Sequence, residues 1–458
     1  MLKIYYFLAF SILHFIGCSQ KTSIVEKNEN EYIITNVSVI PMTRDTILFN
    51  QNVWIKEGRI LNINAETLPK TANIIDGNGK YLIPGLSEMH AHIPTSKDGD
   101  DSAVKEILFL YLSQGVTKIR GMLGDPYHLG LRSAAAEGKI LSPRIYTSSP
   151  SLNGNSIPTP EDAITKVTQY KKDGYDFLKI HPGIKLEVWE ALEKTANQVG
   201  IPFAGHVPTA VGIHRALESQ YKTIDHLDGY LEGLVPQSQD VDPNENGFFG
   251  YNFTPLLDES LIPDLVTKTL QNNVAIVPTQ TLFSRWFSPV PIEELASEKE
   301  MKYVAPKMMF TWRQMRTQYA RDNFSKEQWE KFMDYRIKIL KEMDARGVTF
   351  LLGSDAPQVF NVPGFSIHHE MKDMSDAGIS NYKILQSGTI NPAVFFHTKG
   401  HVGKIIVGAP SDLILLNANP LENIQNAQKI EGVMIGKKWL PKEMIEARLD
   451  KIAKAYEN

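Results

Sequence analysis

Strands and helices alternate between residues 84 and 401, which predicts an α/β fold, a (β/α)8 barrel of the TIM type. Eight short apolar runs can be read in this region, and eight βα units are the number that closes such a barrel. The flanking regions instead carry short strands separated by turn dipeptides such as Asp76-Gly77 and Asn78-Gly79. We therefore expect a small β-sandwich domain, formed by both chain ends together, to complete the barrel.

The expected strands are apolar, β-branched runs bounded by turn residues. Two long loops, 229–263 and 279–341, follow the sixth and seventh barrel strands. We interpret the second loop as a helical lid over the barrel mouth, and the alternative is a Met-rich stripe packed as additional core. The sandwich strands are expected at 32–40, 52–56, 59–63, 411–416 and 432–437, and the barrel strands at 84–92, 116–120, 144–148, 177–180, 203–206, 223–226, 274–278 and 348–355.

Composition limits the classes of partner. The 458 residues are 42% apolar and 22% charged, as in ordinary globular proteins, and are enough for a large domain with a smaller companion. The net charge of −4 gives no argument for binding nucleic acid or an anionic membrane surface. We expect a small-molecule partner and no nucleic acid, while a homo-oligomer stays open.

The amino terminus has the pattern of an export signal. Lys3 precedes an apolar stretch from Ile4 to Gly17, which has the length of a signal-peptide core and is too short to span a membrane freely. The stretch ends at Cys18, the only cysteine, in a context that resembles a bacterial lipobox. We expect an exported protein, lipid-anchored through Cys18 to a bacterial envelope membrane; an incidental thiol is the alternative. The expected divisions are a signal peptide (1–18), a polar tether (19–30), the amino-terminal segment of the sandwich (31–83), the barrel (84–401), the carboxyl-terminal segment of the sandwich (402–441) and a C-terminal helix (442–458).

Residues that bind metals recur at the ends of the expected barrel strands. His90 and His92 alternate on one strand, so both imidazoles point to the same side. Further along the chain, comparable positions carry Lys179, His206, His226 and Asp355. Because the chemistry of TIM barrels lies at the carboxyl ends of the strands, this pattern indicates a hydrolase with a pair of metal ions.

These motifs, taken in order, resemble those of the amidohydrolase superfamily. The run Pro84-Gly85-Leu86-Ser87-Glu88-Met89-His90-Ala91-His92 resembles its opening motif, and Gly174 to Ile180 resembles the fourth strand of its imidazolonepropionase-like and prolidase-like branch. One departure is Glu88, which stands where relatives carry Asp; Glu keeps the carboxylate and with it the expected support of the neighbouring ligand. Further matches are 205–207, 224–227, 352–355, 391–393 and 409–413.

The resemblance implies a role for each residue. His90 and His92 would hold one divalent ion and His206 and His226 the other, with zinc the metal best suited to imidazole. Lys179 would be carboxylated by CO2, and its carbamate would bridge the ions. Asp355 would be both a ligand and the catalytic proton carrier. Weaker expectations are substrate-binding roles for His181, Tyr230 and Arg120, with a structural hydrogen bond as the alternative for each.

The function expected from this resemblance is hydrolysis of a C–N bond by a metal-bridged hydroxide. The substrate would be an amide, a cyclic amide or a dipeptide. One alternative is a lactone or ester hydrolase with the same metal site, because only the leaving atom would differ. Another is a surface lipoprotein that holds metal and binds a ligand without turnover.

Overall fold

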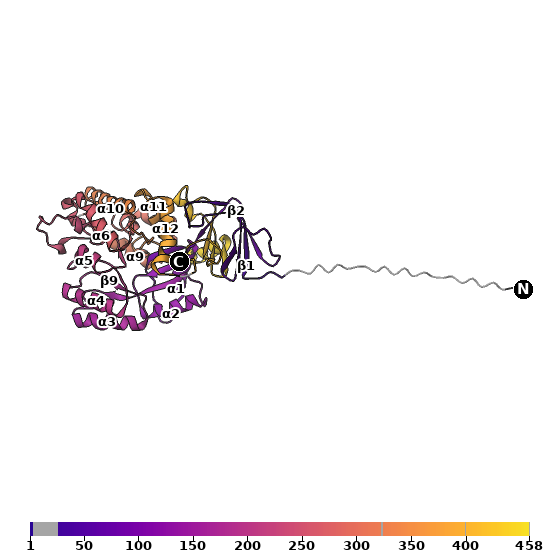
Figure 1. Ribbon diagram of the computed structural model, residues 1–458, viewed down its shortest axis with the longest axis horizontal. Coiled ribbons are helices and arrows are strands. Elements are labelled where there is room, and N and C mark those ends of the chain that lie inside the picture. Colours follow the sequence, from indigo (N-terminus) through magenta and orange to yellow (C-terminus); the bar gives the residue numbers. More distant parts are fainter. Residues whose placement is uncertain (3–25, 322–323, 399, 458) are drawn as a thin grey trace.

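Seven parallel strands form the barrel, and each pairs with its neighbour in sequence. The computed structural model describes residues 1–2, 26–321, 324–398 and 400–457 (Figure 1), so the expected signal peptide and Cys18 lie outside the described residues. Most of these strands are buried along their whole length, as expected when helices cover a parallel sheet. The strands are β6 (Leu86–Ala91), β7 (Val116–Gly121), β8 (Arg144–Leu152), β9 (Phe177–Ile180), β10 (Phe203–Gly205), β11 (Thr223–Asp225) and β12 (Ala275–Val277).

An irregular segment takes the eighth position. Phe350 bridges to Ile276 of β12 and Ala356 bridges to Ala91 of β6, so this segment connects the two open edges. The sequence predicted a regular strand at 348–355, and only its position is right. Asp355 has a φ of 61°, and a residue in the left-handed region cannot continue a strand ladder. The fold is therefore a nearly closed, TIM-like barrel.

Helices surround the barrel, and their ends follow local sequence signals. At α3, Thr159 and Asp162 form a capping box, and Gly174 ends the helix in the left-handed region with a φ of 86°. The helices that alternate with the strands are α1 (Ser102–Ser113), α2 (Pro126–Ala136), α3 (Pro160–Asp173), α4 (Leu186–Val199), α5 (Gly212–Glu218), α6 (Ile262–Gln271), α11 (Ser366–Asp376), α12 (Asn381–Gly388) and α13 (Ile390–Phe395).

The two chain ends meet in a separate, mostly antiparallel sheet, which confirms the predicted companion domain. In Figure 1 its indigo and yellow strands lie together at one side of the barrel. The joint is the antiparallel pairing of β5 with β13, and the strand order is β15-β14-β13-β5-β1-β2-β3, with β4 also paired to β1. These strands are β1 (Glu31–Val39), β2 (Leu48–Lys56), β3 (Arg59–Asn62), β4 (Asn73–Asp76), β5 (Tyr81–Pro84), β13 (Leu413–Leu416), β14 (Ile430–Ile435) and β15 (Lys438–Pro441), followed by α14 (Lys442–Tyr456).

The two long loops contain short helical turns and helices. The loop after β11 holds four 3₁₀ turns, η1 (Glu232–Leu234), η2 (Pro243–Glu245), η3 (Tyr251–Leu256) and η4 (Glu259–Leu261). The segment after β12 is helical, as expected: α7 (Gln280–Arg285), α8 (Ile292–Ala296), η5 (Lys299–Tyr303), α9 (Pro306–Arg321) and α10 (Lys326–Arg346). Some of it is also core, because Phe332, Ile339 and Leu340 of α10 are fully buried. In the described portion of the chain, no helix has the length and apolar character needed to cross a bilayer.

Candidate metal centre

Four histidine rings converge at the carboxyl ends of the barrel strands. The ring of His90 lies 4.5 Å from that of His226 and 5.6 Å from that of His92, measured between centroids. His206 lies 4.8 Å from His226. These residues are far apart in the sequence and come from β6 and from the residues that directly follow β6, β10 and β11. The topology of the barrel therefore brings together the four imidazoles expected to bind metal.

Asp355 completes one set of ligands. Its Oδ1 atom lies 2.7 Å from His92 Nε2 and 3.5 Å from His90 Nε2, and its Oδ2 atom lies 3.9 Å from His226 Nδ1. One donor atom from each of His90, His92 and Asp355 lies within 4.8 Å of the others. Two imidazoles and a carboxylate are ligands that suit zinc and other borderline divalent ions. The donor set present here fits a metal ion.

Lys179 lies in the same centre with an unusual environment for a lysine. Its side chain is fully buried, and Nζ has no hydrogen-bond partner among the described residues. Burial lowers the pKa of this amine to about 8, because a low-dielectric site disfavours the charged form. Gly205 makes room for it: a Cβ there would lie 3.1 Å from Lys179 Cδ and 2.6 Å from the Ile180 carbonyl oxygen. The chain thus presents an unpaired amine to the histidine cluster.

Hydrogen bonds hold Nδ1 of two of these histidines, and a carboxylate lies close to Nδ1 of a third. His206 Nδ1 is hydrogen-bonded to Asp228 Oδ2 at 2.8 Å, and His226 Nδ1 to Thr279 Oγ1 at 2.8 Å. His90 Nδ1 lies 2.9 Å from Asp225 Oδ2. When Nδ1 is held in this way, the lone pair of Nε2 is left free to bind a metal ion, which is the usual arrangement of a metal-binding histidine. Burial also lowers the pKa of His90 and His226, which favours the neutral rings that metal binding needs.

Sequence reasoning missed these three supporting residues. Asp225 directly precedes His226, and Asp228 lies two residues after it. Two carboxylates flanking a candidate ligand were a usable signal. Thr279 gave no such signal, because its contact joins residues more than fifty positions apart.

Glu88 links the two segments that carry His90 and Asp355. It is fully buried, and its Oε1 atom accepts hydrogen bonds from the backbone N–H groups of His90 (3.0 Å) and Ser354 (2.8 Å). Its Oε2 atom accepts from the Ser354 hydroxyl at 2.5 Å. One carboxylate therefore ties the strand that carries His90 to the segment that carries Asp355. The longer side chain in place of the family's Asp still reaches both.

The backbone is strained where the ligands project. His226, Thr279 and Asp355 have φ angles of 68°, 44° and 61°, which residues other than glycine rarely adopt. Such strain persists only where surrounding contacts enforce it, and it clusters at functional sites. Two of these three residues are expected ligands, and the third, Thr279, is hydrogen-bonded to His226.

The three residues with weaker substrate-binding expectations differ in their surroundings. His181 stays at the centre: it stacks on His206 at 4.9 Å between ring centroids, is partly exposed, and is hydrogen-bonded to Ser151. Arg120 is fully buried and donates to Met89, Thr223 and Asp225, so it has a structural contact for each nitrogen of its guanidinium. Tyr230 is fully buried, with its hydroxyl bonded to Thr269. The contacts of Arg120 and Tyr230 favour the structural alternative.

Comparison with solved structures finds proteins of the same architecture. It resembles bottromycin amidohydrolase (20% identity, TM-score 0.70, covering 93% of this chain and 91% of that one). It also resembles molinate hydrolase, at 16% identity and a TM-score of 0.66, covering 90% of this chain and 95% of that one. A Xaa-Pro dipeptidase with bound methionine is similar at 19% identity and a TM-score of 0.63, covering 90% of this chain and 100% of that one. At these identities the likeness shows the fold, including the barrel and the sheet built from both chain ends.

Sequence comparison gives the family. N-acetylglucosamine-6-phosphate deacetylase of Lysinibacillus sphaericus is 32% identical over 72 residues, which is 16% of this chain and only 18% of that protein. The family model described as the amidohydrolase family matches residues 81–440, a range that includes all six expected ligands. The chain therefore belongs to the amidohydrolase family.

Proposed function

We propose that this protein hydrolyses the C–N bond of an amide, a cyclic amide or a dipeptide with the help of two divalent metal ions, most suitably zinc. The observation that carries the proposal is the grouping of His90, His92 and Asp355. Two imidazoles and a carboxylate are donors that a catalytic zinc ion uses. The carboxylate can also carry a proton, a role that a purely structural site does not need.

The second element of the proposal concerns Lys179, His206 and His226. A neutral lysine amine reacts with CO2 to form a carbamate, which offers two oxygens in place of one cation. The pKa of about 8 at Lys179 and the lack of a partner for Nζ support this, because a substantial neutral fraction exists near pH 7–8. The carbamate would bridge the ions, and the two imidazoles would hold the second one.

Asp355 carries the proton in this proposal. Divalent ions held by these residues would lower the pKa of a bound water and would polarise the scissile carbonyl. Asp355 accepts the proton of the attacking water and returns it to the leaving nitrogen, which cannot depart as an anion. We propose that His181, which is partly exposed and stacks on His206, hydrogen-bonds the substrate. The names of the similar solved proteins, an amidohydrolase and a dipeptidase, also support action on C–N bonds.

A substrate panel tests this function. Metal-loaded protein would be assayed against dipeptides, N-acyl amino acids, cyclic amides and lactones. We expect amide turnover that Asp355→Asn lowers by about 10²–10⁴-fold, whereas Asp176→Asn, which changes a carboxylate outside the centre, leaves it unchanged. Turnover of lactones alone would establish the ester alternative. No turnover of any compound by fully metallated protein would favour the binding lipoprotein.

We also propose that Cys18 is lipidated after export, on the basis of the apolar stretch that precedes it. Labelled palmitate should enter the wild-type protein in a bacterial host and should not enter Cys18→Ala. Label that persists in the variant would end this proposal.

A further inference from the structure

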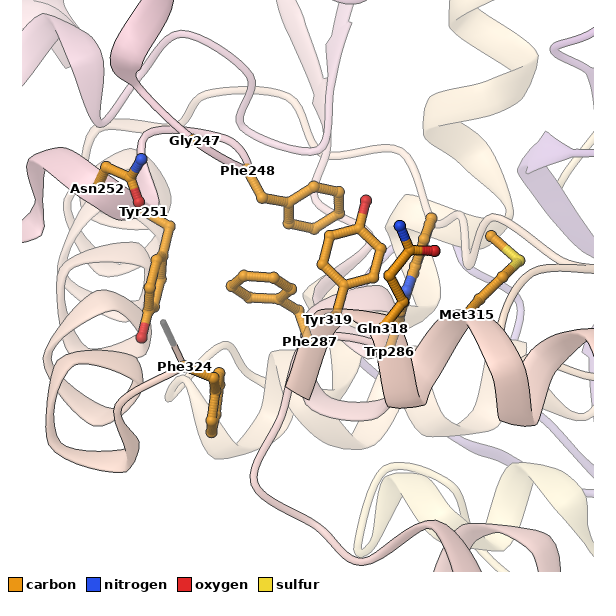
Figure 2. A pocket seen from close by; sticks show the side chains of 10 residues that line it. All are labelled: Gly247, Phe248, Tyr251, Asn252, Trp286, Phe287, Met315, Gln318, Tyr319 and Phe324. Atoms are coloured by element: carbon orange, nitrogen blue, oxygen red, sulfur yellow. The ribbon is translucent and has the colours of Figure 1, made fainter. Parts of the chain in front are cut away.

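We propose that an aromatic pocket beside the metal centre binds an uncharged aromatic or large apolar group of the substrate, so that preferred amides carry such a group close to the scissile bond. This inference rests on the proposed function and names its substrate class. The pocket lies between the loop after β11 and the helical segment after β12 (Figure 2).

The pocket has the size and lining of a small-molecule site. Its volume is about 470 Å³, within the range of roughly 300–1,000 Å³ that is usual for ligand pockets. Among the described residues that line it, none is charged. Among these described residues a charged substrate group would find no counterion for the hydration that it loses. The aromatic lining residues are Phe248, Tyr251, Trp286, Phe287, Tyr319 and Phe324, whose side chains surround the hollow in Figure 2.

Two polar lining residues are already engaged with the protein. The Tyr251 hydroxyl donates to the Ser325 carbonyl at 3.0 Å, and the Asn252 amide donates to the Glu245 carbonyl at 3.0 Å. Their polar ends are held by these bonds, which leaves the ring of Tyr251 as a surface to pack against. Aromatic rings favour offset-stacked or edge-to-face contacts with another ring. The rings that line the pocket thus suit a flat aromatic group.

A pair of adjacent phenylalanines connects the pocket to the histidine cluster. The ring of Phe249 lies 5.7 Å from that of His206 and 5.3 Å from that of His226. The ring of Phe248, which lines the pocket, meets Phe249 edge-on at 4.5 Å. One aromatic ring therefore separates the pocket from two of the expected ligands. The proposal therefore requires that a substrate whose scissile bond lies at the metal centre reaches past Phe249 to place a neighbouring side chain in the pocket.

The backbone fixes these two rings in place. Phe249 has a φ of 53° and the next residue, Gly250, a φ of 79°, so this turn uses two consecutive left-handed residues. For Phe249 that conformation is strained, and the contacts of its ring with His206 and His226 help to hold it. The turn directs Phe249 to the metal centre and leaves Phe248 among Phe287, Trp286 and Tyr319.

The test compares matched dipeptides. The metal-loaded wild-type protein would be assayed with Phe-Ala, Ala-Phe, Ala-Ala, Ala-Asp and Asp-Ala. Phe stands on either side of the scissile bond in this set, so the assay also shows which side faces the pocket. We expect kcat/KM for one Phe dipeptide to exceed that for Ala-Ala by at least about 10–200-fold, the discrimination usual for a single methylene group in an apolar pocket. The Asp dipeptides should be the poorest substrates.

Two variants connect the preference to the pocket. Gln318→Glu adds a charge at the exposed edge of the pocket at nearly constant shape, and should lower the Phe-to-Ala ratio of kcat/KM a few-fold, because a bound apolar group would cover part of the hydrated carboxylate. Phe287→Leu removes one aromatic face and should lower the ratio as well. The matched control is Gln198→Glu on the exposed face of α4, which should leave the ratio unchanged. An unchanged ratio in both pocket variants would overturn the inference.

A binding measurement separates this inference from the proposed function. Calorimetry would compare N-acetyl-L-phenylalanine methylamide with its alanine analogue on the metal-loaded protein. Preferential binding of the phenylalanine compound that Phe287→Leu weakens would support the pocket even if no dipeptide were cleaved, in which case only the proposed function fails. Cleavage of Ala-Ala as fast as the Phe dipeptides, or equal binding of both methylamides, would overturn the inference about the pocket. The proposed hydrolysis of C–N bonds would not be affected by either result.

Discussion

Arg120 offers a direct perturbation of the support beneath the metal centre. Its guanidinium is fully buried, donates to the Met89 carbonyl at 2.6 Å and to the Thr223 hydroxyl at 3.0 Å, and contacts both Asp225 oxygens at 3.2 Å. Asp225 in turn lies 2.9 Å from His90 Nδ1. Arg120→Met keeps an unbranched side chain in this space but removes the charge and every donor.

The expected cost follows from what is left behind. The Asp225 carboxylate, also fully buried, would lose its counterion, and breaking a buried ion pair by removing one partner costs about 3–5 kcal/mol of unfolding free energy. The orientation of His90 would loosen at the same time, and loss of such a supporting contact typically lowers metal affinity about 10–100-fold. The matched control is Arg132→Met. That residue pairs with Asp176 at 2.8 Å with both side chains partly exposed, so its loss should cost about 0–1 kcal/mol.

Two assays follow these effects. Urea denaturation of the metal-free protein gives the change in stability, and competition with a chromophoric chelator gives the zinc affinity. We expect Arg120→Met to lower both and Arg132→Met to lower neither appreciably. If Arg120→Met loses no more stability than Arg132→Met and binds zinc with wild-type affinity, then the connection from Arg120 through Asp225 to His90 does not support the metal centre.

Three further predictions concern other regions of the structure. Arg336 of α10 is fully buried and donates to the His226 carbonyl (2.8 Å), the Pro278 carbonyl (3.2 Å) and Gln280 (2.7 Å). Arg336→Met should therefore lose about 1–3 kcal/mol of unfolding free energy for each acceptor left unpaired. A midpoint of urea denaturation equal to that of the wild type would contradict this prediction. Burial raises the pKa of Asp373 from 3.8 to about 6, so its contribution to stability is complete below about pH 4 and is lost as the pH rises through about 6. Asp373→Asn does not titrate and can still accept the hydrogen bond of Ser284, so its stability relative to the wild type should increase over that window; a difference independent of pH would refute the assignment. Chelation should abolish turnover and lower the thermal midpoint, with both restored by Zn²⁺, because a ligand that binds only the folded chain stabilises it; turnover that survives complete removal of metal would exclude a metal-dependent reaction.

Much of the fold was predictable because hydrophobic periodicity and strand-end polar residues report directly on a parallel barrel. The six expected ligands could be placed at one rim since strand ends converge there whatever the details of packing. The direction of Arg120 could not be predicted, because the twist of β7 decides whether its side chain faces the mouth or the interior. The same holds for Tyr230, whose partner Thr269 lies on a different element. The irregular eighth position depended on the left-handed conformation of Asp355, which the contacts of the folded chain impose.

The supporting contacts were also beyond the sequence. Asp228 and Thr279 act through ring nitrogens of His206 and His226, and such pairings appear only once the loops after β10, β11 and β12 are placed together. The aromatic pocket likewise combines two segments separated by more than thirty residues. Composition showed that these loops were long and rich in aromatic residues, and only the structure showed which rings meet.

The central claim, a paired metal centre bridged through Lys179, is tested most directly by elemental analysis of the purified protein beside Lys179→Ala. After saturation with Zn²⁺ and removal of the excess, the wild type should contain two zinc ions per chain. The variant should contain one or none and should have lost turnover. A wild-type chain that never holds more than one ion, or a variant that keeps two ions and normal turnover, would contradict the account.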